Sequence, residues 1–440
     1  MSAFRVLPAA LLLAACGFPR PERVGDAGLD APTDTEIPPG ISIRVAGTGD
    51  DANDGSTQPV KTLKHAIGLA AANPGITSIV LATGRYASDG GETFPYTVPA
   101  NLTILGPAGG GAILAGSTTE LGMIVNDGTL QDIELERFTV AITTTGNAHL
   151  TNLHIRTGAT AVRAETSAKL TVDKLDIAGT AGACASGLEL HGAAELVATT
   201  LGTNALRTTV DARDQSVVSV SHATITGDSN CGTPRTGVFL ASTSKSLTLS
   251  DSSIDGGDNG IYFVGTQTPT QATVQNTVIR NTKELSITGE RFVLDMHGGE
   301  LSSGSDALAS SDSTATFVGV TIKQHRGFAM TISAGQKLTL RNCMFLNNGS
   351  GVYLFGNGVI DAGVTGDPGN NIFQNGVGTA GIDIDAGVNG AHVSAVGNTW
   401  RPSVQGADLN GHYASGPMPG PLGYSGQVNF NVPATGTIEL

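Results

Sequence analysis

The chain has 440 residues, of which 60 are glycine, and only 14% of its residues are charged. Long amphipathic helices need more Glu, Lys, Arg and Leu than this composition offers, which excludes a largely helical fold. The net charge of −14, without any run of Lys or Arg, excludes nucleic acid as a partner. Many short β-branched segments separated by Gly, Asn and Asp predict one long all-β domain built from repeats.

The first residues have the pattern of a secretory signal peptide. Arg5 precedes an apolar segment that is too short to span a bilayer, and small residues follow it. "LAAC" (13–16) resembles the lipobox of bacterial lipoproteins, which implies removal of residues 1–15 and attachment of lipid to Cys16. The alternative is an ordinary signal peptide with a chance cysteine. An Asp directly after the lipid-bearing cysteine retains lipoproteins in the inner membrane, and this position is Gly17 here. We therefore expect an exported, lipid-anchored cell-envelope protein of the outer membrane.

The segment 16–40 contains few large apolar residues and many Pro, Asp and Gly, which is typical of a disordered linker. "ISIRVA" (41–46) then alternates like a strand, and a loop rich in Asp, Asn and Gly follows it. Thr62 suits the N-cap of a short helix, which "NPG" (73–75) ends. The predicted apolar stripe of this helix consists of Leu63, Ala66, Ile67, Ala70 and Ala71. We therefore predict an N-terminal cap and first coil over residues 41–100, because a solenoid must cover its exposed end.

One frame recurs from about residue 130 onward: an apolar residue, any residue, an apolar residue, four others and an apolar residue. Its occurrences are Ile133-Leu135-Val140, Ala148-Leu150-Ile155, Leu170-Val172-Ile177, Val218-Val220-Ile225, Leu247-Leu249-Ile254, Ala272-Val274-Ile279, Ala315-Phe317-Ile322 and Leu338-Leu340-Phe345. Two residues after its middle position lies Asp251, Asn276, Gly319 or Asn342, types that tolerate a left-handed backbone. The frame therefore predicts a strand, a tight bend and a second strand.

A second frame, Gly followed by alternating apolar residues, appears as "GLEL" (187–190), "GVFL" (237–240), "GIYF" (260–263), "GVYL" (351–354) and "GIDI" (381–384). Alternation at period two turns every other side chain inward. With repeat intervals mostly in the twenties, the two frames predict a right-handed single-stranded parallel β-helix of roughly ten to twelve coils. We place its repeats in 101–415, before a C-terminal tail or cap in 416–440; a β-propeller is the alternative fold.

The N-terminal segments resemble a known family. "VAGTGDDANDGSTQPVKTLKHAI", "LATGRY", "GETFPYTV" and "LTILGP" occur in the order strand, Gly/Asp-rich turn, Pro-x-x-Thr and capping helix. This order is similar to the opening of uncharacterised bacterial pectate-lyase-like β-helix lipoproteins, and "NIFQNG" (371–376) and "GNTW" (397–400) are similar to their last coils. The resemblance implies a right-handed parallel β-helix that is exported, with no established activity to transfer.

Two groups of charged residues are candidate sites. Asp50, Asp51 and Asp54 could bind Ca²⁺, a hard ion that takes oxygen ligands. The favoured alternative is a turn in which their carboxylates accept loop amides, so that no cofactor is required. The second group is a row across successive coils, predicted as Asp255, Arg280, Glu300 and Lys323. Arg280 or Lys323 could serve as the base of a lyase beside Asp255 or Asp258, but an exposed salt-bridge ladder is favoured because the charges alternate.

Aromatic residues and cysteines complete the candidates. Phe239, Tyr262 and Tyr353 occupy the outward position of equivalent strands, where they could form a stripe for sugar rings or simply pack under loops. Cys184 and Cys231 lie in loops and could form a disulfide in an exported protein. Cys343 lies in an apolar strand and is predicted to be buried.

The sequence contains no HExxH, GxSxG or GxxxxGK motif, so metalloprotease, serine hydrolase and P-loop functions lack support. We predict a monomeric, membrane-tethered and non-catalytic surface protein or carbohydrate-binding module. The alternative is a polysaccharide lyase or hydrolase that acts on acidic glycans.

Overall fold

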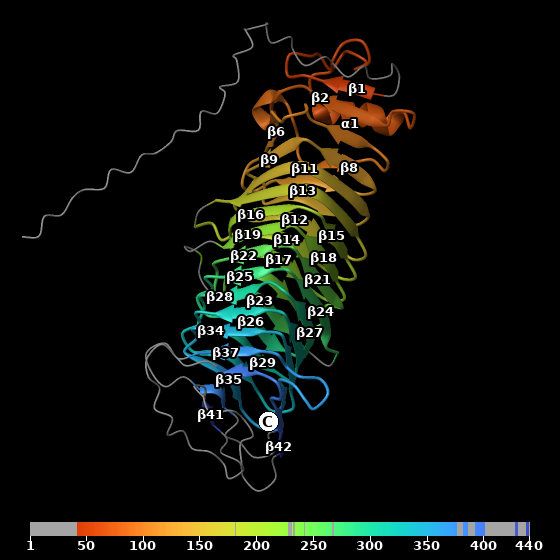
Figure 1. The fold of residues 1–440 in the computed structure, drawn as a ribbon. Coiled ribbons are helices and arrows are strands. Elements are labelled where there is room, and N and C mark those ends of the chain that lie inside the picture. The colour runs from red at the N-terminus through yellow and green to blue at the C-terminus, as the bar shows by residue number, and fades with distance from the viewer. Residues whose placement is uncertain are drawn as a thin grey trace, which may run out of the picture. The chain divides into compact units, whose positions relative to one another are not determined.

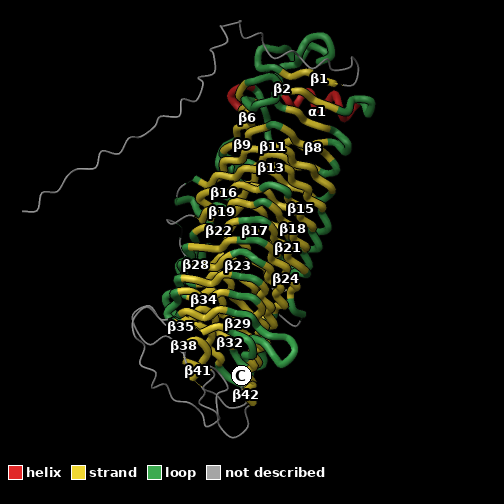
Figure 2. Tube along the Cα trace, viewed as in Figure 1, coloured by secondary structure: helices red, strands yellow, loops and turns green. Residues whose placement is uncertain are grey.

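The computed structural model describes residues 42–180, 182–227, 231, 234–241, 243–265, 268–375, 382–385, 392–400, 427–429 and 437–439. The predicted signal peptide, Cys16 and the linker 16–40 lie outside these residues. The described part of the chain forms an all-β parallel solenoid of about 12 turns, as the sequence predicts. Its strands stack along one axis from β1 to β42 (Figures 1 and 2).

The strands form three columns, and each coil passes through all three. The first column comprises β1 (Ser42–Val45), β2 (Ser78–Leu81), β5 (Thr103–Leu105), β8 (Gly128–Gln131), β11 (Asn147–Thr157), β13 (Lys169–Gly179), β15 (Glu195–Ala198), β18 (Val217–Ser221), β21 (Ser246–Ser250), β24 (Thr270–Gln275), β27 (Phe292–His297), β30 (Thr314–Val318), β33 (Lys337–Arg341), β36 (Val359–Asp361), β39 (His392–Ser394) and β42 (Thr437–Glu439).

The second column comprises β3 (Gly84–Ala87), β6 (Ala112–Ala115), β9 (Ile133–Glu136), β16 (Leu201–Leu206), β19 (Ala223–Gly227), β22 (Ser253–Asp255), β25 (Val278–Arg280), β28 (Glu300–Ser302), β31 (Thr321–Lys323), β34 (Met344–Leu346), β37 (Ile372–Gln374) and β40 (Thr399–Trp400). The long strands β11 and β13 run through both the first and the second column, which joins these columns into one 28-stranded sheet.

The third column is a separate 14-stranded sheet. It comprises β4 (Tyr96–Val98), β7 (Leu121–Val125), β10 (Val140–Thr144), β12 (Thr160–Ala164), β14 (Ser186–Leu190), β17 (Thr208–Ala212), β20 (Thr236–Leu240), β23 (Asn259–Val264), β26 (Leu285–Glu290), β29 (Asp306–Ser311), β32 (Phe328–Ile332), β35 (Ser350–Leu354), β38 (Ile382–Asp385) and β41 (Gln427–Asn429). The Gly-initiated frame of the sequence marks members of this column.

The bend between the first and second columns has the left-handed backbone that the first frame predicts. The φ angles are 48° at Asp251, 46° at Asn276, 67° at Gly319 and 56° at Asn342. Asp and Asn tolerate this region better than other residues with a β-carbon. The bend therefore does not need a glycine in each coil.

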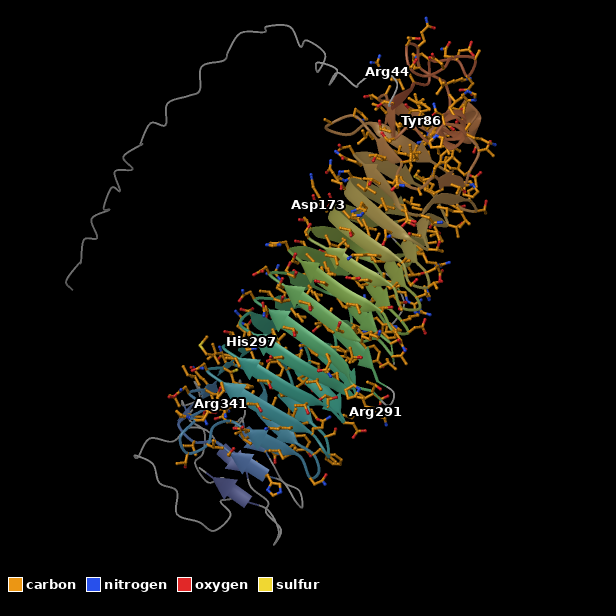
Figure 3. The ribbon with its side chains drawn as sticks, turned by 90° about the vertical axis from the view of Figure 1, so that its right-hand side faces the viewer. Arg44, Tyr86, Asp173, Arg291, His297 and Arg341 are labelled. Atoms are coloured by element: carbon orange, nitrogen blue, oxygen red, sulfur yellow. The ribbon has the colours of Figure 1, made fainter. Side chains whose placement is uncertain are left out.

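The core consists of the inward residues of all three columns. Apolar side chains at alternate strand positions are almost fully buried, and like residues stack on one another from coil to coil. The rings of Phe345 and Phe373, for example, lie 4.7 Å apart in adjacent coils. Each coil therefore buries its apolar face against its neighbours, which is how a solenoid is stabilised. Figure 3 shows the side chains that cover the outside of the stack.

One occurrence of the first frame is out of register. Leu135 pairs with Ile155, and Leu130 pairs with Leu150. The frame in this coil is therefore Gly128-Leu130-Leu135 rather than the predicted Ile133-Leu135-Val140. The sequence pattern misleads because this coil has a glycine, Gly128, at the first inward position.

The helix α1 (Leu63–Ala72) follows β1, as predicted, and Thr62 accepts the amide of His65 at 3.2 Å. Its buried residues are Leu63, Ala66, Ile67 and Ala70, and they pack on β1, β2 and β4. Ala71 is exposed, which corrects the predicted stripe. A short 3-10 helix, η1 (Ser88–Gly90), precedes β4. No helix of the described residues is long and apolar enough to cross a membrane.

Candidate functional site

A polar groove of about 990 Å³ runs across the second column over β9, β11, β13, β16 and β19. We define this polar groove by Asp132, Glu134, His154, Arg156, Lys174 and Asp176, which are among its lining residues. A loop of three glycines, Gly109 to Gly111, forms part of its wall, and all three have φ between 91° and 104°. The backbone of this loop therefore reaches a conformation that side-chain-bearing residues rarely adopt.

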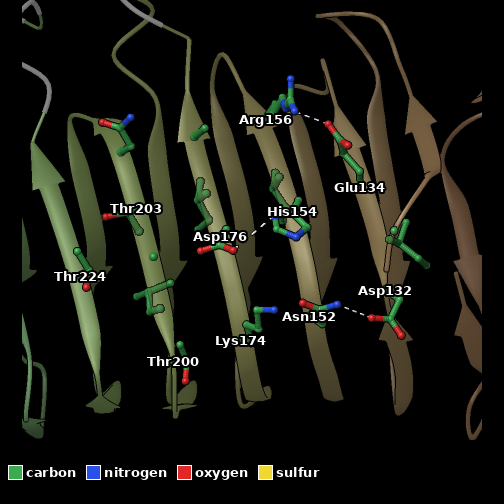
Figure 4. A pocket seen from close by; sticks show the side chains of 18 of the residues that line it. Asp132, Glu134, Asn152, His154, Arg156, Lys174, Asp176, Thr200, Thr203 and Thr224 are labelled. Carbon is green, nitrogen blue, oxygen red and sulfur yellow. Dashed lines mark hydrogen bonds and ion pairs between the residues drawn. The ribbon is translucent and has the colours of Figure 1, made fainter. Parts of the chain in front are cut away.

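The register of the strands places three functional side chains in one row. Glu134 pairs with His154, and His154 pairs with Asp176 in the next coil. All three occupy outward positions, so their side chains line the groove at intervals of about 4.8 Å, the usual strand separation. Figure 4 shows this row on three neighbouring strands.

The carboxylates of the groove are held by direct partners. Arg156 Nε forms an ion pair with Glu134 Oε1 at 2.9 Å, and His154 Nδ1 lies 3.5 Å from the carboxylate of Asp176. The next residue in the row is Gly202, where an added β-carbon would lie only 2.2 Å from Asp176 Oδ1. The glycine therefore gives the Asp176 carboxylate room to lie over the next coil.

A second row runs along the bend between the columns. Asn152 donates to the carboxylate of Asp132, and Lys174 follows one coil later in a left-handed conformation. Lys174 has no ion-pair partner among the described residues. With the ion pairs of the first row, this free ammonium leaves the groove close to electrically neutral, although the whole chain carries −14.

A recess of about 500 Å³ continues the groove along the stack. It shares His222 and Thr224 with the polar groove and adds Asp251 and Asn276 from the next two coils. Amide, hydroxyl, imidazole and carboxylate groups thus recur along one face over seven successive strands of the second column.

The predicted catalytic row is not brought together as a site. Arg280 is paired with Asp255 at 2.8 Å, and Lys323 is paired with Glu300 at 2.7 Å. Ser302 occupies the register position between Arg280 and Lys323, whereas Glu300 pairs with Val278. Glu300 therefore lies two residues from its predicted position, because the frame of this coil is Leu294-Met296-Leu301 and Ser302 follows its last apolar residue.

Neither Arg280 nor Lys323 is suited to act as a base, because each is paired with a carboxylate. Burial alone would raise the pKa of the Glu300 carboxyl, but hydrogen bonds from Lys323 and Ser302 outweigh this effect and lower it. Lys323 is therefore held against an ionised carboxylate. The ladder interpretation of the sequence describes this arrangement better than the lyase interpretation.

Asp258 has a structural partner instead of a catalytic one. It is fully buried, and Arg235 donates to it from its backbone amide at 2.9 Å and from its guanidinium at 2.6 Å. Burial alone would raise the pKa of Asp258, but the bonds from Arg235 outweigh it and lower the pKa. Asp258 therefore fixes the backbone before β20 and is not available to a substrate.

The predicted aromatic stripe is interrupted. Phe239 and Tyr262 are direct neighbours in the third column, with ring centroids 5.6 Å apart. Tyr353 occupies the same outward position four coils after Tyr262, with Thr288, Ala309 and Thr331 in between. A shallow trough of about 380 Å³ lies over these small residues. The aromatic residues thus form two groups rather than one continuous stripe.

The Asp-rich loop has the geometry of the turn alternative. The carboxylates of Asp50 and Asp54 each accept the amide two residues further on, at 3.0 and 2.9 Å. Asp51 accepts both the amide and the hydroxyl of Thr62, at 2.9 and 2.8 Å. No group of three or more His, Cys, Asp or Glu side chains in the described part of the chain is arranged to bind a metal. Calcium binding at this loop stays a prediction.

The structure shows no bond between Cys184 and Cys231, and the disulfide that the sequence allows stays a prediction. Cys184 precedes β14 and Cys231 precedes β20, and β17 lies between these strands. Cys343 is buried as predicted, and burial raises the pKa of its thiol to about 11.

A model of the family described as "Protein of unknown function (DUF1565)" matches residues 47–333, which include the Asp-rich loop, α1, the polar groove and the trough's first strands. The chain belongs to the DUF1565 family. No curated protein sequence matches this DUF1565 member.

Three solved structures are similar to this member of the DUF1565 family. The catalytic domain of a GH87 alpha-1,3-glucanase in complex with tetrasaccharides has a TM-score of 0.45 and 10% identity, over 73% of this chain and 67% of that one. The mannuronan C-5 epimerase AlgE6 A-module of Azotobacter vinelandii has a TM-score of 0.39 and 12% identity, over 85% and 94%. The Dettilon tailspike protein has a TM-score of 0.33 and 12% identity, over 88% and 68%. Similarity at this level does not identify a shared activity.

Sequence reasoning missed the polar groove of this DUF1565 protein. Apart from the loop Gly109 to Gly111, its lining residues lie between 132 and 224, whereas the predicted row lies between 255 and 323. The signal available in the sequence was the polar residue at each bend, here Asp132, Asn152, Lys174 and His222. Because such residues also close turns, their type alone does not distinguish a bend from a binding surface.

Proposed function

We propose that this protein is an exported, lipid-anchored glycan-binding protein, and that a glycan chain lies along the polar groove. The observation that carries this proposal is the row Glu134, His154 and Asp176, one side chain per coil, with Lys174 beside it. The strand separation of about 4.8 Å is close to the length of one sugar residue in an extended chain. A linear glycan could therefore meet the same kind of hydrogen-bonding group at successive residues.

The chemistry of the groove favours a polar ligand with little net charge. Carboxylates, amides, imidazoles and hydroxyls both accept and donate hydrogen bonds, as a polyhydroxylated ligand requires. The near balance of charge gives no strong attraction to a polyanion, and the negative charge of the whole chain repels one at long range. The lipid on Cys16 would keep the groove at the cell surface.

The test is calorimetric titration of the purified protein with a panel of neutral and uronate polysaccharides. Binding of a neutral polymer should weaken about tenfold in Asp176→Asn and in Lys174→Ala, because a lost charge-assisted hydrogen bond contributes about 1.5–3 kcal/mol. Gly202→Ala should weaken it as well, since a β-carbon there displaces the Asp176 carboxylate.

Asp295→Asn is a matched control for the Asp176 variant. Asp295 is another exposed aspartate paired with a histidine, His297 at 2.9 Å, and it lies in the first column, away from the groove. This variant should bind like the wild type. Absence of binding to every polymer, or equal binding by Asp176→Asn and the wild type, would disprove the proposal.

A second candidate function is hydrolysis of a glycosidic bond in the same groove. Glu134 and Asp176 lie on the two strands that flank the strand of His154, on one face, and glycosidases use a pair of carboxyl groups that flank the scissile bond. One carboxyl would protonate the leaving oxygen while the other removes a proton from the attacking water. Release of reducing ends by the wild type, and its loss in Glu134→Gln, would support hydrolysis; polymer binding without release would exclude it.

A further inference from the structure

The trough on the third column is a separate feature from the polar groove. It lies over β23, β26, β29 and β32, in coils that follow those of the groove, and on the other sheet. Tyr262 lines one end of the trough, and Tyr353 occupies the same outward position in the coil that follows β32, just beyond the lining residues. Four strand separations place these two residues about 19 Å apart.

The floor of the trough is small and carries hydroxyl groups. Thr288, Ala309 and Thr331 occupy the positions between the two tyrosines. Hydroxyls of Ser311 and Ser333 line the side. The backbone continues at constant spacing along this face. The depression therefore forms because short side chains lie between two large rings.

The aromatic rings at both ends are held in place by neighbouring rings. Tyr262 meets Phe239 edge to face at 5.6 Å, and Tyr353 is stacked on Phe328 at 4.7 Å. Phe355, which is 59% exposed, lies 6.4 Å from Tyr353 and extends that end outward. Rings that are already fixed lose little conformational freedom when a ligand covers them.

The trough carries little charge. Glu290 is its one charged lining residue, and it has no side-chain hydrogen bond or ion pair among the residues that the structure describes. No Lys or Arg lines the trough to attract an anion. A carboxylate at this site can accept hydrogen bonds from hydroxyls, and it repels acidic sugars.

We propose that the trough binds a neutral linear oligosaccharide, with one sugar ring stacked on Tyr262 and another on Tyr353. A pyranose ring has an apolar C–H face, which suits an aromatic ring, and hydroxyls at its edge, which suit the floor and Glu290. Because one strand separation is close to the length of one sugar residue, the span matches roughly four residues. The site is independent of the polar groove and remains even if the groove binds nothing.

The experiment compares glucose disaccharides with tetrasaccharides of β-1,3 and β-1,4 linkage by titration calorimetry of the whole protein. A tetrasaccharide reaches both tyrosines, so its affinity should exceed that of the disaccharide at least tenfold. Tyr262→Ala and Tyr353→Ala should each remove this advantage, and the double variant should lose little more. Tyr→Phe at either position should retain it, because the ring remains.

Three controls separate stacking from other causes. Tyr262→Leu and Tyr353→Leu keep apolar packing against the neighbouring rings, so a loss of affinity in them reflects the missing ring and not unfolding. Met344→Ala removes an exposed apolar side chain from the second column and should leave binding unchanged. Lys174→Ala, a variant of the polar groove, shows whether the tetrasaccharide lies in the groove instead.

Two results would overturn the proposal. One is the absence of tetrasaccharide binding by the wild type. The other is tetrasaccharide binding that both tyrosine variants retain. If Lys174→Ala abolishes binding and Tyr262→Ala does not, the glycan lies in the groove, the trough is not a site and the proposed function stands.

Discussion

The carboxylate of Glu92 accepts the backbone amide of Leu63 at 2.8 Å, and thereby closes the N-terminus of α1 from a loop far along the chain. It also accepts the amide of Lys64 at 3.2 Å and the hydroxyl of Tyr96 at 2.6 Å. Glu92 is almost fully buried, so these bonds form in an environment where a carboxylate requires them. This contact gives a structural role to Glu92, the glutamate of "GETFPYTV", to which the sequence alone assigned none.

The first prediction follows from this contact. Glu92→Gln removes the negative charge from the positive end of the helix dipole and replaces one acceptor oxygen by a donor. We expect the free energy of unfolding to fall by about 1–2 kcal/mol and the amides of Leu63 and Lys64 to exchange faster with solvent. Glu195→Gln, which alters an exposed glutamate 3.8 Å from Lys169, should change stability by less than about 0.5 kcal/mol. Equal effects of the two variants in urea denaturation would contradict the role of Glu92.

The second prediction contrasts a buried ion pair with an exposed one. Asp258→Ala leaves the Arg235 guanidinium buried without its main partner and should destabilise the fold by about 3–5 kcal/mol. Asp255→Ala breaks the exposed pair with Arg280 and should cost no more than about 1 kcal/mol. Thermal unfolding of the two variants measures the difference. Similar losses of stability in the two variants would show that burial of Asp258 does not increase the contribution of its ion pair.

The third prediction concerns pH. Burial lowers the pKa of His325 to about 4, and neither ring nitrogen has a hydrogen-bond partner in the described part of the chain. The unfolded chain takes up this proton below pH about 6.5, whereas the folded protein does so only near pH 4. Stability therefore falls as the pH drops through this window, by up to about 3 kcal/mol from this residue.

His325→Asn should remove that dependence, because an amide side chain does not titrate. The substitution should fit the site, because Asn348 and Asn375 in the following coils already form a hydrogen-bonded ladder, at 2.8 Å. Asp306 and Asp383 act in the opposite direction, since burial raises their pKa to about 6 and about 7, and their stabilising contribution is lost as pH rises. Both remain in the variant and cancel in the comparison. An unchanged difference in urea midpoint between pH 7 and pH 4 would refute this role of His325.

The fourth prediction tests calcium at the Asp-rich loop. Burial alone would raise the pKa of the Asp51 carboxyl, but hydrogen bonds from Thr62 and Lys61 outweigh it and lower the pKa. Because these oxygens are already used, Asp51→Ala should lower the thermal midpoint to the same extent with calcium and with EDTA. A rise in the midpoint with calcium in the wild type, absent in Asp51→Ala, would establish a metal site instead.

The fifth prediction concerns the anchor. Cys16→Ser should abolish incorporation of labelled palmitate and release the protein from the membrane fraction, because the thiol of Cys16 is the proposed attachment point for lipid. Cys184→Ser, at a half-exposed cysteine of the solenoid, is the control and should leave both unchanged. Lipid labelling that persists in Cys16→Ser would show that the anchor lies elsewhere.

Local patterns determined much of the fold. Alternation at period two predicts which side chains of a strand turn inward, and residues such as Asp251 and Asn342 predict where the chain bends. Both rules depend only on residues a few positions apart. Thr62 and the stripe of α1 follow from the same kind of short-range rule, with Ala71 as the exception at the helix end.

The candidate sites depended on register, which only the tertiary structure decided. Glu134 and His154 are 20 residues apart, whereas Thr224 and Ser253, also neighbours in the stack, are 29 apart. Turns absorb these differences, and the inward apolar side chains select the pairing that fills the core. Outward polar side chains take no part in that selection, so the sequence misplaced Glu300 and did not reveal the row Glu134, His154 and Asp176.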